Sequence, residues 1–319
     1  MLHGGVSIII PCFNGARYLA GLATCLATVK LEAREIIFVD DGSTDSSGDL
    51  FVDLVPKARV VRQINCGVAS ARNAGAAAAQ GEFLQFLDAD DVILPGKLDA
   101  QASYASRCGM DVLYSGWQMV VVDGQRVNRE LVCDQLMPCE PVAALLSGWW
   151  VPPHAYLIRR SAYVAVGGSD ASLVNAQDYD LLVRMAIAGC TFGHMPGHYC
   201  DYYRYLEATS LARGPRRQYW SDYEKAVENA IALLERSDGF DDARRMAAAQ
   251  KLHSIARSVY SIDRVWFDRV VQRIHEIAPG FVPVGTLSYK TAVRVLGMSN
   301  AERTAAIVRR CKALLSTRV

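Results

Sequence analysis

Residues 81–91 read GEFLQFLDADD, and this stretch decides the fold that we predict. An apolar run of buried-strand length, residues 83–87, leads directly into three carboxylates, Asp88, Asp90 and Asp91. Carboxylates this close together repel one another, so they stay ionised only where water or a cation lies among them. Hard divalent ions take such ligands together with substrate phosphates. The stretch therefore predicts a metal–phosphate site after a strand; the alternative is a solvated turn that caps the next helix.

Three further strand-like runs precede this one, and helical stretches separate them. The four predicted strands are residues 6–10, 35–39, 59–63 and 82–87. This alternation predicts an α/β fold with a doubly wound, mainly parallel sheet. In such sheets ligands bind beyond the C-terminal ends of the strands. Polar residues follow each end here, namely Asn14, Asp40 with Asp41, Asn65, and Asp88 to Asp91, which favours the functional interpretation of the acidic turn.

The remaining chain is predicted to form mixed structure and then helices. A strand at 111–115, a hairpin at 118–133 and a strand at 198–205 flank a helix at 176–188. Amphipathic helical stretches follow at 217–236, 241–262, 264–278, 286–296 and 300–315. We therefore predict a first domain over residues 1–211 and a helical C-terminal extension over residues 212–319.

Composition and charge narrow the class of protein. Half of the 319 residues are apolar (51%), which is enough for a sizeable core. The net charge of +1 hides an asymmetry: residues 1–211 hold 15 Lys+Arg and 22 Asp+Glu, whereas residues 212–319 hold 19 and 11. The first part is therefore acidic, which favours binding of cations, and the second part is basic, which favours binding of anions.

Cysteine usage and hydropathy predict the compartment. The nine cysteines form no C-x-x-C pair, and an odd number fits a disulfide framework poorly. We see no signal peptide, and no apolar run approaches the roughly 18 residues of a membrane span. We expect a cytoplasmic protein in a reducing compartment.

Five motifs in order resemble the family-2 inverting glycosyltransferases of the GT-A fold. They are VSIIIPCFNG (6–15), VDDGSTD (39–45), NCGVASARNAG (65–75), FLDADD (86–91) and QDYDLLVRMA (177–186). The resemblance covers residues 5–211 and implies that the first domain binds the nucleotide sugar and carries the catalytic residues. It implies transfer of a sugar from a nucleoside-diphosphate donor to a hydroxyl acceptor, in cell-surface polysaccharide or glycoconjugate synthesis.

The resemblance implies a set of nucleotide-binding residues. Pro11, Phe13 and Asn14 would line the nucleotide pocket. Asp41 would accept a hydrogen bond from the N3–H of the base, which favours a UDP- or dTDP-linked donor; its alternative role is to cap the helix that follows Ser43. Arg72 would lie by the base or the pyrophosphate, where a guanidinium suits phosphate oxygens.

The resemblance also implies a metal site and a general base. Asp90 would bind Mg²⁺ or Mn²⁺, and Asp88 would hold the ribose hydroxyls or a metal-bound water. Asp178 would take the proton from the acceptor hydroxyl. The family has an acidic pair at this helix start, but here Gln177 precedes Asp178. The alternative role of Asp178 is that of an acid favoured at a helix N-terminus.

Further contacts to donor or acceptor are predicted at Arg204, His154 and Trp150. Arg204 matches a family Tyr-Arg pair that precedes a histidine which often binds the metal. Leu206 stands in place of that histidine, so the third metal ligand is left open. His154 and Trp150 lie in an aromatic, proline-stiffened loop, and structural packing is the alternative for both.

The C-terminal segment carries a separate hypothesis. Residues 285–319 hold seven Lys+Arg and one acid, Glu302, together with an apolar face. They would contact the anionic inner leaflet, where a lipid-linked acceptor is found; a solvated helical cap is the alternative.

Other function classes are weaker. A nucleotidyltransferase or a non-catalytic nucleotide-sugar-binding subunit are the alternatives to a transferase. No G-x-G-x-x-G follows the first strand, which disfavours a dinucleotide oxidoreductase. The basic excess lies outside any recognisable nucleic-acid-binding module, so nucleic acid is not an expected partner. The sequence does not specify the oligomeric state.

Overall fold

The computed structural model describes residues 5–29, 34–206 and 216–316, which cluster into two compact units. The sheet unit contains the chain up to residue 141 together with residues 150–214. The helical unit contains residues 142–149 and the chain from residue 215 onward. The predicted boundary between residues 211 and 212 lies among residues 207–215, outside the described residues.

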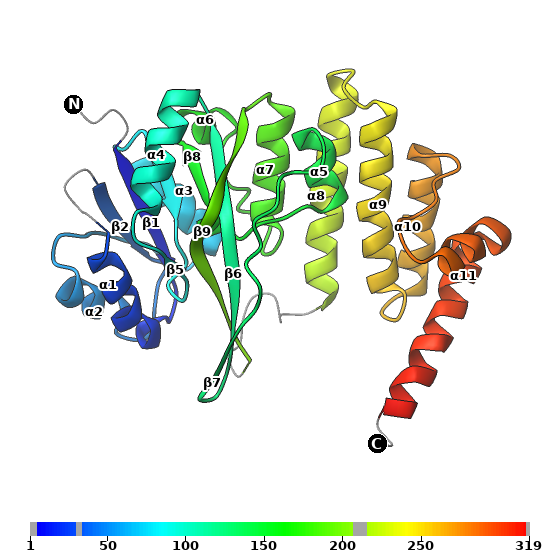
Figure 1. The fold of residues 1–319 in the computed structure, drawn as a ribbon, viewed down its shortest axis with the longest axis horizontal. Helices are drawn as coiled ribbons and strands as arrows, with labels where there is room; N and C mark the ends of the chain where they lie inside the picture. Colours follow the sequence, from blue (N-terminus) through cyan, green and yellow to red (C-terminus); the bar gives the residue numbers. More distant parts are fainter. Residues whose placement is uncertain (1–4, 30–33, 207–215, 317–319) are drawn as a thin grey trace. The chain divides into compact units, whose positions relative to one another are not determined.

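The sheet unit is built on four parallel strands in the order β3-β2-β1-β4 (Figure 1). Their register places Cys12 opposite Asp40 and Asp40 opposite Arg62, so these strands end at one edge of the sheet. The strands are β1 (Val6–Cys12), β2 (Arg34–Asp40), β3 (Arg59–Arg62) and β4 (Phe83–Phe86). Every residue of β1 and β4 is buried, as expected of central strands in a doubly wound sheet.

A mixed extension continues the sheet beyond β4, in which β6 and β9 pair in parallel and the other pairs are antiparallel. Its order is β8-β6-β9-β5, and β8 runs antiparallel to both β4 and β6. The strands are β5 (Val92–Ile93), β6 (Val112–Asp123), β7 (Arg126–Arg129), β8 (Tyr156–Arg159) and β9 (Phe192–Tyr205). The mainly parallel α/β sheet predicted from the sequence is confirmed.

Two strand predictions in this extension were wrong in extent. The strand predicted at 111–115 and the first strand of the hairpin predicted at 118–133 form one strand, β6, whose pairing with β9 shifts register between Ser115 and Trp117. Strand β9 begins at Phe192 rather than at residue 198. Gly193 and Gly197 weaken the local strand signal, but pairing along β6 supplies the hydrogen bonds that local propensity lacks.

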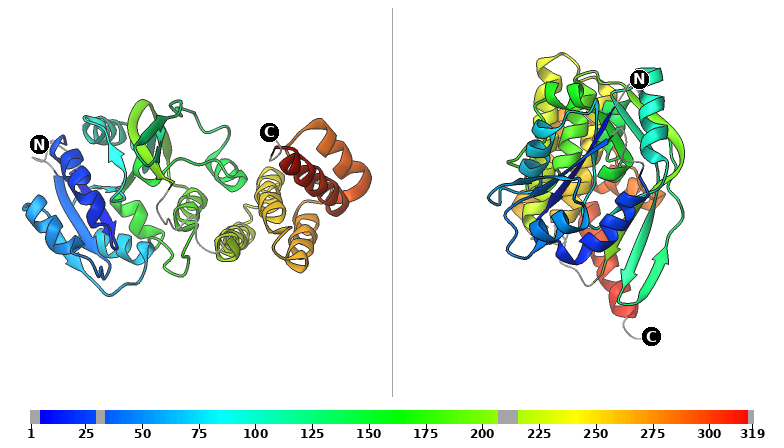
Figure 2. Two further views of the ribbon diagram at one scale, coloured as in Figure 1. Left: turned by 90° about the horizontal axis from the view of Figure 1, so that it is seen from below. Right: turned by 90° about the vertical axis from the view of Figure 1, so that its left-hand side faces the viewer.

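Helices cover both faces of the sheet. Figures 1 and 2 show α3 and α4 on opposite sides of it. The α-helices of this unit are α1 (Leu19–Ala27), α2 (Ser47–Leu54), α3 (Val68–Ala78), α4 (Lys97–Cys108), α6 (Arg160–Ala165) and α7 (Gln177–Ile187). Short 3₁₀ turns, η1 (Ala16–Tyr18) and η3 (Pro153–Ala155), precede α1 and β8.

Helix α3 packs on the sheet at a glycine. A Cβ atom added at Gly75 would lie 2.3 Å from Ile9 Cγ2 and 3.3 Å from Val39 Cγ2. We expect Gly75→Ala to lower the free energy of unfolding by about 1–3 kcal/mol, because an added methyl forces α3 away from β1. Gly21→Ala in α1, where nothing lies within 4 Å, is the control and is expected to stabilise by about 0.5–1 kcal/mol. Equal urea midpoints for the two variants would contradict this packing.

The first residue of α4 is a buried lysine. Lys97 is 0% exposed, and its Nζ donates hydrogen bonds to Gln85 Oε1 and Gln101 Oε1, both at 2.5 Å. Burial lowers the pKa of Lys97 to about 7, because the ammonium form loses its hydration.

This pKa predicts a pH-dependent stability. Between pH 7 and about 10 the unfolded chain holds the Lys97 proton more tightly than the folded chain does, so stability rises with pH. We expect Lys97→Met to remove up to about 1.4 kcal/mol per pH unit of that slope. Urea unfolding at pH 6, 7.5 and 9 measures it. Parallel pH profiles for the two proteins would show that Lys97 does not titrate in this range.

The helical unit consists of long helices and one short one. They are α5 (Pro141–Ser147), α8 (Arg216–Arg236), α9 (Asp242–Val259), α10 (Arg264–Ile277) and α11 (Leu287–Ser316). Helices α8, α9 and α10 lie side by side (Figure 1). Helix α11 bends at Gly297, whose φ is 75°, within the interruption predicted between residues 296 and 300. None of the helices in the described ranges has both the length and the apolar composition that crossing a bilayer requires.

Candidate active site

The acidic turn after β4 is held by a buried ion pair. Asp91 is 2% exposed; its Oδ1 accepts a hydrogen bond from the Tyr203 amide (2.9 Å), and its Oδ2 lies 2.9 Å from His154 Nδ1. Burial raises the pKa of Asp91. Burial also disfavours a charged His154, but the neighbouring Asp91 raises the pKa of this imidazole well above its usual value. His154 is fully buried and lies against the acidic turn, which fits the structural alternative and not the predicted sugar contact.

Asp90 is the carboxylate of this turn whose charge is least compensated. Burial, followed by repulsion from Asp91 and Asp88, raises the pKa of Asp90 to about 7. In the described part of the chain no Lys or Arg forms an ion pair with it. A divalent cation would remove both the repulsion and the cost of burying the charge.

Arg72 joins the acidic turn to the start of α7. Its guanidinium is 3% exposed; Nη1 contacts Asp178 Oδ1, and Nη2 lies 3.0 Å from Asp88 Oδ1. Burial opposes the charged form of Arg72, but these two carboxylates raise its pKa, so the guanidinium stays charged. Asp88 and Asp178, which follow Arg72 by 16 and 106 residues in the sequence, therefore both contact its guanidinium.

The carboxylate of Asp178 is part of this contact yet retains access to solvent. Its side chain is 31% exposed, and that of Asp88 is 33% exposed. Burial raises the pKa of Asp178, and Arg72 partly opposes this effect. Beside it, the Arg72 Nε and Gln177 Oε1 atoms are buried without a hydrogen-bond partner among the described residues. Such orphaned polar atoms are expected where a bound molecule completes the site.

Asp41 organises the N-terminus of α3 rather than the helix after Ser43. Its Oδ1 accepts hydrogen bonds from Gln63 Nε2 (2.6 Å) and the Cys66 amide (2.9 Å), and its Oδ2 accepts one from the Gly67 amide (2.9 Å). Asp41 is 3% exposed. A carboxylate has about four acceptor positions, so these three donors leave room for one more.

Residues at the end of β1 and just after it line the same edge. Pro11 is buried and Phe13 is 50% exposed. Asn14 has a φ of 53°, and its Oδ1 accepts hydrogen bonds from the amides of Thr44 (2.7 Å) and Asp45 (3.2 Å). The side chain of Asn14 thus ties the β1 loop to the β2 loop.

Aromatic residues form a wall beside the acidic turn. Trp150 is 39% exposed and stands edge-on to Trp117 (5.4 Å between ring centroids) and to Tyr202 (5.8 Å). The Tyr202 ring also stacks on His154 (6.1 Å between ring centroids), which contacts Asp91, so this ring lies by the acidic turn. Burial and then the nearby Asp91, Asp88 and Asp90 raise the pKa of Tyr202 to about 12. Sequence reasoning missed Tyr202 and Trp117, although the aromatic richness of residues 198–205 was visible. Arg204 is exposed near the end of β9.

The described residues do not form a preassembled metal site. In residues 5–29, 34–206 and 216–316 no group of three or more His, Cys, Asp or Glu side chains is arranged to hold a metal ion. Asp90 with Asp88 nevertheless fits Mg²⁺ or Mn²⁺, because such ions are commonly held by one or two carboxylates plus substrate phosphates.

Small hollows lie beside described segments of the sheet unit. A hollow of about 80 Å³ lies between residues 66–69 and residues 171–174, next to the loop that Asp41 holds. A larger one of about 190 Å³ involves residues 28–29 and 94–99 and includes none of the predicted site residues.

The sequence is similar to known glycosyltransferases. Residues 7–142 match the model of glycosyl transferase family 2. An uncharacterized glycosyltransferase of Haemophilus influenzae is 32% identical over 128 residues, which are 39% of this chain and 51% of that protein. Another from Nostoc sp. is 44% identical over 97 residues, which are 29% of this chain and 30% of that protein. These alignments therefore span about a third to half of the relatives' lengths.

The fold is similar to that of a solved structure that contains a nucleotide sugar. The structure of S. aureus TarS 1–349 in complex with UDP-GlcNAc has a TM-score of 0.68 and 16% identity, covering 96% of this chain and 91% of that one. The same protein in complex with UDP gives a TM-score of 0.64. At this identity the likeness shows the fold alone.

Proposed function

The chain contains a glycosyltransferase family 2 domain with a GT-A-type fold, and from this we propose that it transfers a sugar, with inversion, from a nucleoside diphosphate to a hydroxyl acceptor. The observation that carries the proposal is the meeting of Asp88 and Asp178 on the Arg72 guanidinium, at the edge where the parallel strands end. A cationic group that can bind phosphate, Arg72, and a candidate general base, Asp178, thus share one site.

Asp178 is the proposed general base. The acceptor oxygen forms a bond to the anomeric carbon from the face opposite the leaving group, and its proton passes to the Asp178 carboxylate. The bond from the anomeric carbon to the diphosphate oxygen breaks, and its electron pair leaves with the nucleoside diphosphate. Burial raises the pKa of Asp178, which makes this carboxylate a stronger base than an ordinary aspartate.

Arg72 and the acidic turn are proposed to bind the diphosphate. The guanidinium of Arg72 is charged and lies beside the partly exposed carboxylates of Asp88 and Asp178, and its planar N–H donors suit phosphate oxygens. Asp90 and Asp88 would hold Mg²⁺ or Mn²⁺. When bound, the ion neutralises charge on the departing diphosphate. Arg204, exposed near the end of β9, is a proposed second contact to the donor.

A uridine or thymidine donor is favoured by Asp41. Its remaining acceptor position suits the imide N–H of such a base, and the 66–69 loop beside it borders a hollow. Pro11, Phe13 and Asn14 are proposed to line the nucleotide from the β1 side. The TarS structures hold UDP-GlcNAc and UDP, which makes these two ligands reasonable first probes.

The acceptor is proposed to be a sugar, free or lipid-linked, that stacks on the wall of Trp150 and Tyr202. Both rings lie beside the acidic turn, and aromatic faces bind the apolar faces of sugar rings. Synthesis of a cell-surface polysaccharide or glycoconjugate is the proposed context.

The screen that tests the donor proposal is thermal shift with nucleotide sugars, with Mn²⁺ and with EDTA. We expect UDP- or dTDP-linked sugars to raise the melting temperature by mass action, and only with the metal. A protein that binds such ligands but releases no UDP with any acceptor would instead be the non-catalytic binding subunit. If none of the UDP- or dTDP-linked sugars binds, both the transferase and the binding-subunit proposals are wrong.

The C-terminal helix is proposed to contact an anionic membrane from the cytoplasmic side. Glu302, the one acid in residues 285–319, is fully buried, accepts a hydrogen bond from Tyr289 (2.9 Å) and pairs with Arg257 (3.2 Å). The exposed face therefore carries basic charge, together with Leu287 and Val295, which are 79% and 73% exposed.

Reversing three basic charges tests this contact in the full chain. We expect the triple variant Lys290→Glu, Arg294→Glu, Arg303→Glu to lose flotation with phosphatidylserine vesicles, since each basic residue contributes about 1 kcal/mol near such a surface. Neutral vesicles and Arg236→Glu on α8 are the controls. Equal flotation of wild type and triple variant would dismiss membrane contact through α11.

A further inference from the structure

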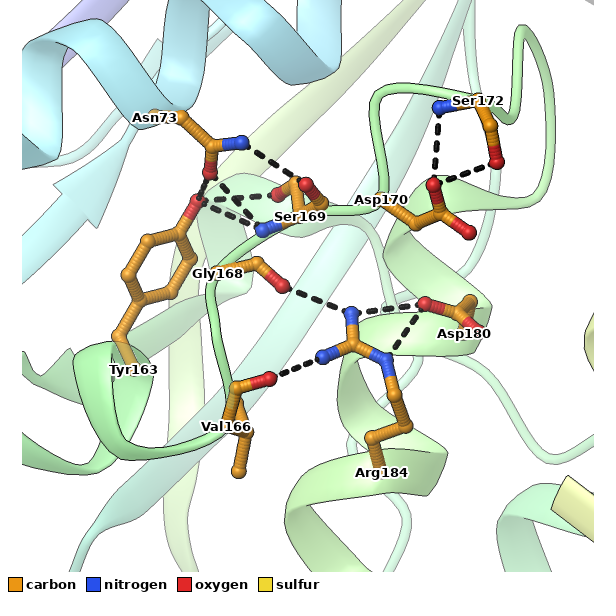
Figure 3. Close-up of polar contacts among 9 residues, drawn as sticks. All are labelled: Asn73, Tyr163, Val166, Gly168, Ser169, Asp170, Ser172, Asp180 and Arg184. Carbon is orange, nitrogen blue, oxygen red and sulfur yellow. Dashed lines mark hydrogen bonds and ion pairs between the residues drawn. The ribbon is translucent and has the colours of Figure 1, made fainter. Parts of the chain in front are cut away.

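The segment before α7 is held from two sides by polar contacts (Figure 3). It consists of residues 166–169, which we call the strap, and it contains Gly167 and Gly168 with φ of 81° and 70°. One side of the strap faces α3, which carries Arg72, and the other faces α7, which carries Asp178.

On the α3 side, Asn73 uses both ends of its amide. Its Nδ2 donates to the Ser169 carbonyl (2.8 Å), and its Oδ1 accepts from the Ser169 amide (2.9 Å). The Tyr163 hydroxyl donates to the same Oδ1 (2.6 Å). The approach is close: a Cβ atom added at Gly168 would lie 2.5 Å from Asn73 Oδ1.

On the α7 side, Arg184 holds the strap by two carbonyls. Its Nη1 donates to the Val166 carbonyl and its Nη2 to the Gly168 carbonyl, both at 2.7 Å. Its Nε donates to Asp180 Oδ2 at 2.7 Å, one turn earlier on the same helix. Asp180 is 2% exposed, so this guanidinium is fixed in orientation by a buried carboxylate.

The two anchors bracket the proposed catalytic pair. Asn73 is the residue after Arg72, and Asp180 lies two residues after Asp178, so the strap connects the two helices next to the Arg72–Asp178 contact. The contact between Arg72 and Asp178 joins residues that are 106 positions apart. Among the described residues, no backbone hydrogen bond joins α3 to α7. The relative placement of the two side chains therefore depends on what ties the helices together.

We propose that Asn73 and Arg184 are positioning residues, which clamp the strap between α3 and α7 and thereby hold Asp178 in register with Arg72. The proposal rests on the proposed transferase function, in which Asp178 is the base. A clamp of this kind affects the rate more than donor binding, since a misplacement near 1 Å can lower a rate about 100-fold. An ordinary loop anchor would instead change stability alone.

Two near-isosteric variants break the clamp and one matched variant does not. Asn73→Asp keeps the Oδ1 acceptor but turns the Nδ2 donor into an oxygen that faces the Ser169 carbonyl. Arg184→Lys keeps the charge but has a single nitrogen for three acceptors. Arg160→Lys on α6 is the control, because the Nε of Arg160 donates to a single acceptor, the Gly81 carbonyl (2.9 Å), so one lysine nitrogen is enough there.

Kinetics with a defined probe separate positioning from binding. We measure UDP release from UDP-GlcNAc with Mn²⁺, and UDP affinity by calorimetry. We expect Asn73→Asp and Arg184→Lys each to lower kcat about 10- to 100-fold with the UDP dissociation constant within about twofold. Arg160→Lys should change neither. Wild-type kcat in both clamp variants would overturn the proposal.

Hydrogen exchange tests the linkage without turnover. If the strap couples the helices, Asn73→Asp accelerates amide exchange at residues 177–182 on α7, and Arg184→Lys accelerates it at residues 69–75 on α3. Changes confined to the helix that carries the substitution would overturn the clamp. Coupled exchange in a protein that turns over no donor would uphold the clamp and refute the transferase.

Discussion

Asp178→Asn is expected to lower kcat by about 10²- to 10⁴-fold, the usual contribution of a general base. The amide keeps the size of the carboxylate but has no basic oxygen for the acceptor proton. Because the side chain contacts the Arg72 guanidinium and Asp88 continues to pair with it at 3.0 Å, we expect the fold and UDP affinity to be retained. Steady-state UDP release and calorimetry with UDP measure the two effects.

Gln177→Glu is the informative companion to this variant. It restores an acid beside Asp178, and a like charge raises the pKa of a carboxylate. The acidic limb of the rate profile should therefore move to higher pH, because the base works only when deprotonated. If the Asp178→Asn variant keeps the wild-type kcat, a group other than Asp178 takes the proton from the acceptor hydroxyl.

Asp90→Asn should have opposite effects on activity and stability. Loss of the metal is expected to lower turnover about 100-fold or more, because such an ion contributes several kcal/mol to a developing anion. The free protein should become more stable near pH 7. Burial and the neighbouring carboxylates raise the pKa of Asp90 to about 7, so its ionisation in the folded state costs free energy as pH rises from about 4 to 7.

Two measurements separate these effects of Asp90. Thermal melting without ligand reports the stability gain, and the Mn²⁺ dependence of the UDP-induced shift reports the metal. Asp53→Asn, an exposed acid on α2, is the matched control and should alter neither. If Asp90→Asn preserves the Mn²⁺-dependent shift, Asp90 is not a ligand.

Local patterns in the chain were sufficient to predict the framework of the site. The apolar runs of β1, β2 and β4 are each followed by polar residues, and parallel strands bring such ends to one edge by geometry. The acidic turn, Asp41 and Asp178 were predicted in this way or from motif order. Their chemical roles stay predictions, since each depends on a ligand.

The sequence by itself determined the mainly parallel α/β sheet and the helical C-terminal part, because hydrophobic periodicity is a property of neighbouring residues. Only the tertiary structure decided that Arg72 pairs with Asp178, that His154 is buried against Asp91, and that β9 begins at Phe192. Each of these depends on groups that are distant in the chain. The burial and pairing energies of these groups arise only once the elements have packed, so the propensities of neighbouring residues do not predict them.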